Sequence, residues 1–131
     1  MTRINLIPPQ ELMDLHLLAE YRELPRVFPL VEAAQEKGLT PQDIKIPQTF
    51  CLGTGHVLFF YNKLIFLMNR QRSLVEEMLR RGYAPNFVEP MNLRFSNILA
   101  HWWNDWIPSQ EEIAISRARI EQRRQEYEAR G

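Results

Sequence analysis

The first 28 residues of the chain bring together groups that could perform amine chemistry. A second residue as small as Thr2 predicts removal of Met1, which leaves a free α-amine on Thr2. Because the pKa of an α-amine lies well below that of a lysine, part of this amine is unprotonated near neutral pH without burial. The carboxylate of Glu23 follows, with Arg22 and Arg26 close by. An amine nucleophile, an acid/base group and anion-binding residues fit a Schiff-base reaction on a phosphorylated or nucleic-acid substrate.

A long helix is expected to carry these side chains. Apolar residues recur at helical spacing between about Gln10 and Lys37, and Gly38 is a natural end for such a helix. The apolar positions are Leu17, Leu24, Phe28 and Val31. Pro25 and Pro29 lie inside this stretch and predict a kink, since proline removes a backbone hydrogen bond and crowds the preceding turn.

The opposite side of this helix is polar, and it has two interpretations. At 100° per residue, one broad side collects His16, Ala19, Glu20, Arg22, Glu23 and Arg26. A solvated face explains this pattern and is favoured by the residues alone, because Glu–Arg pairs three and four residues apart contribute only about 0.2–0.5 kcal/mol each. The proline kink favours the alternative, a site, because it would aim the polar side at one point.

Two further helices complete the expected fold. The first covers about 56–81, and the second starts at Ser109, which forms a capping box with Glu112, and continues to about Tyr127. Residues 83–107 are irregular, and no segment shows the alternation of a good strand. The sequence therefore predicts an all-α protein of three long helices with irregular connections.

Three other groups of residues have both a structural and a functional interpretation. Arg119 and Arg123 lie four apart, a repulsive spacing unless an anion lies between them, and a neutralised surface and a phosphate contact are equally supported. The turn Gly53–His56 could seat a phosphate on backbone N–H groups. It lacks the length and the lysine of a P-loop, so a tight turn is favoured. The three tryptophans within 102–106 could stack on bases, but tryptophans more often cover the core.

The composition narrows the classes further. With 131 residues, 45% of them hydrophobic, the chain should form a single domain over residues 1–131. No apolar run reaches membrane-spanning length, and the first residues lack the basic flank and apolar core of a signal peptide, so we do not expect secretion. The lone Cys51 excludes an internal disulfide and a cysteine-based zinc site. The 16 basic and 16 acidic residues give zero net charge, which argues against a generic nucleic-acid binder. Most of the basic residues are arginines, however, so a nucleic-acid surface would be a local arginine cluster.

Several blocks of the sequence match one known family. The blocks are Met1–Leu6, Glu11–Phe28, Lys45-Ile46, Thr49-Phe50, Leu52-Gly53, Gly55–Val57, Phe59–Tyr61, Lys63-Leu64, Arg81-Gly82, Ile107-Pro108 and Ile113–Arg119. These blocks are spread over most of the chain, and in them it resembles the pyrimidine-dimer DNA glycosylases of the bacteriophage endonuclease V type, enzymes that excise ultraviolet photoproducts.

The resemblance implies a three-helix fold whose N-terminal segment threads between the helices. It implies that the Thr2 α-amine attacks C1′ of the damaged nucleotide, expels the base and forms an imine, after which β-elimination nicks the strand as in an AP lyase. Glu23 matches the family's essential acid, which stabilises the cationic sugar and imine and assists proton removal. The residues matching DNA-contacting or further active-site positions are Arg3, His16, Arg22, Arg26, Arg119 and Arg123.

The resemblance also implies the setting in which the protein works. The partner would be double-stranded DNA containing pyrimidine dimers, kinked so that the base opposite the lesion flips out. We expect a monomer without metal, cofactor or membrane contact, in the cytoplasm of a bacterial or phage-infected cell and close to the nucleoid. The alternatives are the same chemistry on another lesion, such as a ring-opened purine, and a non-catalytic helical DNA-binding protein. The intact Thr2–Glu23 pair favours an enzyme, because a pure binder would not need it.

The chain departs from the phage pattern in several places. Residues 32–42 lack the basic cluster of the phage protein, and Glu126–Gly131 replace its aromatic-rich tail. The segment Trp102–Trp106 is particular to this chain, and Arg123 stands where the phage member carries a lysine. Together with zero net charge, these departures predict weak charge-driven scanning of undamaged DNA.

Overall fold

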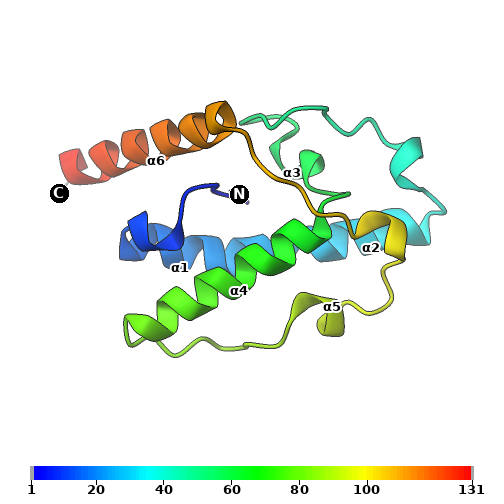
Figure 1. The fold of residues 1–131 in the computed structure, drawn as a ribbon, viewed down its shortest axis with the longest axis horizontal. Coiled ribbons are helices and arrows are strands. Elements are labelled where there is room, and N and C mark those ends of the chain that lie inside the picture. Colours follow the sequence, from blue (N-terminus) through cyan, green and yellow to red (C-terminus); the bar gives the residue numbers. More distant parts are fainter. Residues whose placement is uncertain (1, 131) are drawn as a thin grey trace.

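The first long helical element is broken in two at Pro25. In the computed structural model, which describes residues 2–130, α1 spans Asp14–Glu23, a 3-10 turn spans Leu24–Arg26, and α2 spans Val27–Glu36 (Figure 1). The sequence predicts a kink from Pro25 and Pro29. The regular helix is interrupted at Pro25, which has no N–H to donate to the preceding turn, whereas α2 continues through Pro29. The helix begins later than the expected Gln10, because a separate 3-10 turn occupies Pro9–Glu11.

The second helix is interrupted, and the prediction of one continuous helix from about residue 56 is wrong between residues 60 and 63. The structure has a short α3, His56–Phe59, and a long α4, Leu64–Arg80. In a continuous helix the carbonyl of Phe59 would accept the backbone N–H of Lys63. Instead the Lys63 Nζ donates to that carbonyl at 2.9 Å, while the Lys63 N–H turns to Phe60 O. The Lys63 side chain thus takes the place of its own backbone N–H at the Phe59 carbonyl, at the point where the helix is interrupted.

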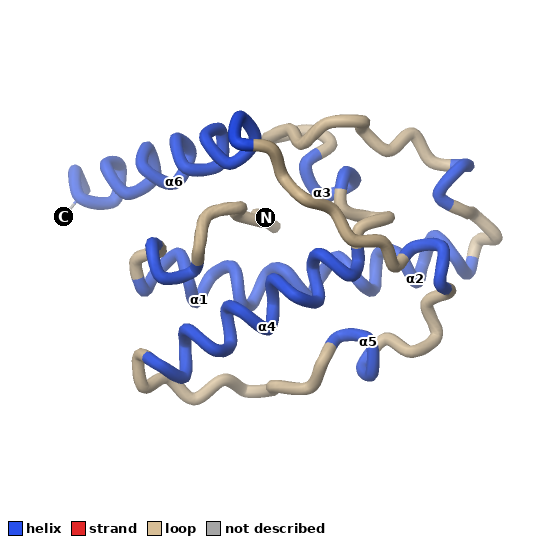
Figure 2. The backbone as a smooth tube through the Cα atoms, in the orientation of Figure 1, coloured by secondary structure: helices blue, strands red, loops and turns tan. Residues whose placement is uncertain are grey.

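The last helix forms as expected and is longer than expected. Helix α6 spans Gln110–Arg130, and its capping box is present, with Ser109 N donating to Glu112 Oε1 at 2.9 Å and Glu112 N to Ser109 Oγ at 3.1 Å. The connection before it is mostly loop, with a one-turn α5, Met91–Arg94, and a 3-10 turn at Ala100–Trp102 (Figure 2). Residues 2–130 contain no strand, so the all-α prediction is confirmed.

The helices enclose one core and leave a gap that the N-terminal segment occupies. Helix α4 crosses in front of α1, and α6 lies above this pair in the view of Figure 1. Residues 2–7 run between α6 and the pair. The largest fully buried side chains are Trp102, Phe28, Phe59 and Phe60, and the predicted apolar stripe of α1 and α2 is completely buried. Trp103 and Trp106 pack against this core, which agrees with the interpretation of the tryptophans as core residues.

Candidate active site at the N-terminal segment

Side chains from three helices hold the N-terminal segment through its backbone. Each N–H group of residues 3–6 donates to a different side chain. The pairs are Arg3 N to Glu23 Oε1 at 3.0 Å, Ile4 N to His56 Nε2 at 2.9 Å, Asn5 N to Glu20 Oε2 at 3.3 Å, and Leu6 N to Ser116 Oγ at 2.9 Å. The acceptors come from α1, α3 and α6, so the position of this segment depends on all three helices.

His56 is a structural acceptor within this arrangement. Its Nδ1 lies 2.9 Å from the carbonyl oxygen of Cys51, which can only accept, so Nδ1 carries the proton and Nε2 is free to accept from Ile4. Burial lowers the pKa of His56 to about 4, opposed by the hydrogen bond to Cys51. The preceding Gly55 has φ +90°, and a Cβ there would lie 3.3 Å from Pro47 Cγ. These observations support the tight-turn interpretation of residues 53–56.

Five of the predicted site residues meet at one small pocket of about 40 Å³. The pocket lies between the N-terminal segment, α1 and α6 and is lined by Arg3, Asn5, His16, Ala19, Glu20, Glu23, Arg119, Ile120 and Arg123. Thr2, which is half-buried, directly precedes Arg3 at this pocket. Met1 lies outside the described residues, so its predicted removal stays a prediction.

The pocket concentrates positive charge around one half-buried carboxylate. Burial, together with the charges of Arg3 and Arg123, lowers the pKa of Arg119 to about 10. Burial and the charge of Arg123 also lower the pKa of Arg3. Burial and the charges of Arg123 and Arg3 lower the pKa of His16, which is therefore neutral near pH 7. Arginines that crowd together in this way favour an anion placed between them.

Several polar atoms of the pocket are buried without a partner. The Nε atoms of Arg119 and Arg123 and the Nδ1 of His16 form no hydrogen bond within the described structure. By contrast, the Nη2 of Arg119 donates to Ile4 O and to Asn5 Oδ1, each at 3.1 Å. Desolvated donors that lack partners cost free energy, and an anionic ligand that draws on these side chains would offset that cost.

Arg22 and Arg26 lie outside this pocket. Both are exposed, and Arg22 borders a separate groove with Tyr83 and residues 84–86. Neither side chain forms a hydrogen bond or ion pair with any of residues 2–130, whereas the exposed Arg117 is paired with Glu11 at 3.1 Å. Arg22, near the end of α1, and Arg26, in the 3-10 turn that follows, therefore lie at the surface outside the pocket.

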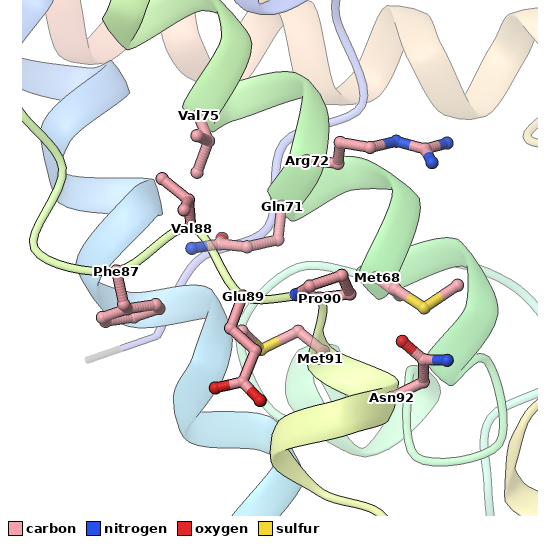
Figure 3. A pocket seen from close by; sticks show the side chains of 10 residues that line it. All are labelled: Met68, Gln71, Arg72, Val75, Phe87, Val88, Glu89, Pro90, Met91 and Asn92. Carbon is pink, nitrogen blue, oxygen red and sulfur yellow. The ribbon is translucent and has the colours of Figure 1, made fainter.

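A larger cavity lies elsewhere and contains none of the reactive groups. It has a volume of about 290 Å³ and is enclosed by α4 and by residues 87–92 (Figure 3). Phe87, which lines this cavity, stacks on Tyr21. The side chain of Tyr21 projects from the side of α1 opposite to that of Glu23, because the two residues are two positions apart in the helix. Its charged lining residues, Arg72 and Glu89, form no ion pair in the described structure. The small pocket at Glu23 is accordingly the candidate active site.

Within residues 2–130 the structure contains neither a cluster of metal ligands nor a membrane-spanning helix. No three His, Cys, Asp or Glu side chains cluster in a way that could hold a metal ion. No helix in this part of the chain has the length and apolar character needed to cross a membrane.

Sequence reasoning missed a buried ion pair behind the pocket. Arg70 of α4 contacts Glu20 of α1, with Nε 2.8 Å from Oε2, and the two side chains are 7% and 1% exposed. One signal was available, because Arg70 lies on the buried stripe of α4 between Leu67 and Leu74. A charged residue on an apolar stripe needs a buried partner.

The sequence of the chain matches one known protein family. The family model for pyrimidine dimer DNA glycosylases matches residues 1–88. The matched stretch includes Thr2, Glu23, Arg70 and all of α1–α4, whereas α5 and α6 follow it. The match covers 88 of 131 residues, about two thirds of the chain. The chain therefore belongs to the pyrimidine dimer DNA glycosylase family, a family of DNA repair enzymes.

Proposed function

We propose that this DNA repair glycosylase cleaves the N-glycosidic bond of ultraviolet-induced pyrimidine dimers through an imine with the Thr2 α-amine and then nicks the strand by β-elimination. One observation carries the proposal: Arg3 N lies 3.0 Å from Glu23 Oε1. The backbone nitrogen of Thr2, the residue before Arg3, lies about 3–4 Å from Arg3 N by covalent geometry. Once Met1 is removed, the amine and the carboxylate therefore share one small volume.

The chemistry follows from this pairing. The unprotonated amine attacks C1′ of the damaged nucleotide, and the C1′–N bond breaks as the base leaves with the bonding electrons and a proton. The attacking nitrogen gives up this proton, and its lone pair then opens the C1′–O4′ bond to form an iminium ion, while O4′ takes the bonding electrons and a proton from water. Glu23 stabilises this cation and takes the proton from C2′, and the electrons released expel the phosphate from C3′.

The arginines supply the contacts to DNA in this proposal. Arg3, Arg119 and Arg123 surround the pocket, so they would hold the phosphates next to the reacting sugar. His16 is neutral because burial and two arginines lower its pKa, so it would contribute a hydrogen bond rather than a charge. Arg22 and Arg26, exposed and without internal partners, would contact phosphates further along the duplex.

Covalent trapping tests the mechanism directly. Processed protein is incubated with a dimer-containing duplex and borohydride, which reduces the imine to a stable amine. We expect an adduct that maps to residue 2 by peptide mass spectrometry. The matched control retains Met1, which moves the amine by a full residue, and it should trap poorly. An adduct on a lysine would overturn the mechanism.

A further inference from the structure

We propose that the buried Glu20–Arg70 ion pair is a positioning element that sets the register of residues 2–7 and thereby delivers the Thr2 amine to Glu23. The inference rests on the proposed imine chemistry. Glu20 borders the pocket but is only 1% exposed, and Arg70 lies behind it in α4. Neither residue is placed to react, so any effect on the reaction must pass through the N-terminal segment.

The guanidinium of Arg70 uses its donors on two different elements. Nε donates to Glu20 Oε2 at 2.8 Å and Nη2 to Glu20 Oε1 at 2.9 Å, which is a bidentate pair. Its Nη1 donates to the carbonyl of Ile7. One side chain of α4 therefore fixes both the Glu20 carboxylate and the far end of the N-terminal segment.

The Glu20 carboxylate passes this constraint to the middle of the segment. Asn5 donates its Nδ2 to Oε1 at 2.9 Å and its backbone N to Oε2 at 3.3 Å. Each oxygen thus accepts from both Arg70 and Asn5, which uses the acceptor capacity of a carboxylate. The Oδ1 of Asn5 in turn accepts from Arg119, so the chain of contacts continues to α6.

These contacts determine where the amine lies. The pair holds residues 5 and 7, and the start of the same segment is the part that reaches Glu23. A slip of one residue would move the amine by about 3.3 Å along an extended chain. Since a misplacement of about 1 Å can lower a rate by about 100-fold, register control at this distance is kinetically important.

Helix α4 also provides a matched control. Glu77, which is 2% exposed, pairs with Arg80 and Arg81, and Arg81 Nη2 donates to Leu12 O at 2.7 Å. This second buried carboxylate also ties α4 to the N-terminal part of the chain. It holds the chain near residues 9–14 rather than residues 2–7. Loss of Glu77 should therefore lower stability without shifting the amine.

The experiment measures trapping and binding separately on a duplex with an abasic site. The variants are Glu20→Gln, Arg70→Lys, the double variant Glu20→Met/Arg70→Met, and Glu77→Gln as the control. The double variant leaves no unpaired buried charge, so it keeps the test valid where Glu20→Gln folds poorly. Single-turnover borohydride trapping is followed at saturating enzyme, well below the melting temperature of each variant.

We expect Glu20→Gln and the double variant to trap about 10- to 100-fold more slowly than the wild type, with duplex affinity changed by less than about 3-fold. Arg70→Lys should be intermediate, because lysine keeps the charge but loses the bidentate geometry. Glu77→Gln should lower the melting temperature and keep the wild-type trapping rate. Equal slowing by the Glu20 and Glu77 variants, or wild-type trapping by the double variant, would overturn the positioning role. Failure of the wild type to trap at residue 2 would instead overturn the proposed function.

Discussion

Two carboxylates on successive positions of the same face of α1 have opposite environments. Glu20 and Glu23 each accept a backbone N–H from the N-terminal segment, from Asn5 and Arg3 respectively. Glu20 is 1% exposed and is saturated by Arg70 and Asn5. Glu23 is half-buried, and the hydrogen bond it accepts within residues 2–130 comes from Arg3 N.

This difference in hydrogen bonding suits the two carboxylates to different tasks, one structural and one chemical. A carboxylate whose lone pairs are all occupied by fixed donors cannot accept a proton without breaking those contacts. A carboxylate with free lone pairs beside a pocket can take a proton from a substrate. The same residue type, three positions apart, is therefore suited to structure at Glu20 and to proton transfer at Glu23.

The largest expected effect is a loss of stability when Glu20, the carboxylate with all its acceptor positions occupied, is replaced. Glu20→Gln leaves the Arg70 guanidinium buried without its counter-charge, which should lower the free energy of unfolding by about 3–5 kcal/mol. Urea denaturation monitored by circular dichroism measures this change. Glu23→Gln, made for comparison, should cost less than about 1 kcal/mol because the Glu23 side chain forms no ion pair within residues 2–130. Similar losses for the two variants would contradict the contrast between them.

The pH dependence of stability tests His56, whose imidazole holds Ile4 of the same N-terminal segment. The pKa of His56 is about 4 in the folded protein because of burial and 6.5 in the reference state, so the unfolded chain binds a proton that the native one rejects between these values. Stability should therefore be complete above about pH 6.5 and fall on acidification to pH 4, by up to about 3 kcal/mol from this group.

The control for this titration is His56→Gln, whose side-chain carbonyl can accept from Ile4 but does not titrate in this range. The free energy of unfolding is measured for both proteins across pH 4–7. The difference between the two curves isolates His56 from His16 and from the carboxylates. Parallel curves would show that His56 does not resist protonation in the folded protein.

The proposed catalytic role of Glu23 is tested by the rate of strand cleavage rather than by stability. Glu23→Gln keeps the shape of the side chain and removes its charge, so strand cleavage should fall by at least about 100-fold while binding to damaged duplex persists. Single-turnover nicking and equilibrium binding are compared on the same dimer-containing duplex. Cleavage by Glu23→Gln at the wild-type rate would remove Glu23 from the mechanism.

The smallest expected effect concerns the arginines outside the pocket. Arg22→Ala and Arg26→Ala should each lower the slope of log affinity against log salt by about 0.9, the value for one lost phosphate contact. Arg117→Ala is the control, because Arg117 is exposed but already paired with Glu11. Binding isotherms at several salt concentrations give the three slopes. A slope change for Arg117→Ala as large as for the other two would place the DNA surface differently.

Much of the architecture could be predicted from local pattern. The break at Pro25, the capping box at Ser109 and the apolar stripe of the first helical element follow from rules that act within a few residues. The interruption after Phe59 could not be predicted in this way. It depends on the Lys63 side chain and on the distant Asn104, whose carbonyl accepts the backbone N–H of Ile65.

The candidate site shows the same division. Arg3, His16, Glu23, Arg119 and Arg123 were predicted as site residues, and the structure brings them to one pocket, although their roles stay predictions. The contacts that hold the segment join residues far apart in sequence, such as Arg70 with Ile7, and no local spacing reveals them. The exposed positions of Arg22 and Arg26 likewise depend on which face of α1 packs against the core.

The hydrogen bond from Leu6 to Ser116 has a consequence for the order of events during synthesis. It joins residues 110 apart, and the contact from Arg119 to Ile4 joins residues 115 apart. The ribosome makes the N-terminal segment first, but that segment lacks part of its binding surface until α6 has emerged. The predicted removal of Met1 would therefore have time to occur before this segment docks. A nascent chain without α6 also lacks Arg119 and Arg123, so the proposed site would be complete only after α6 has been made.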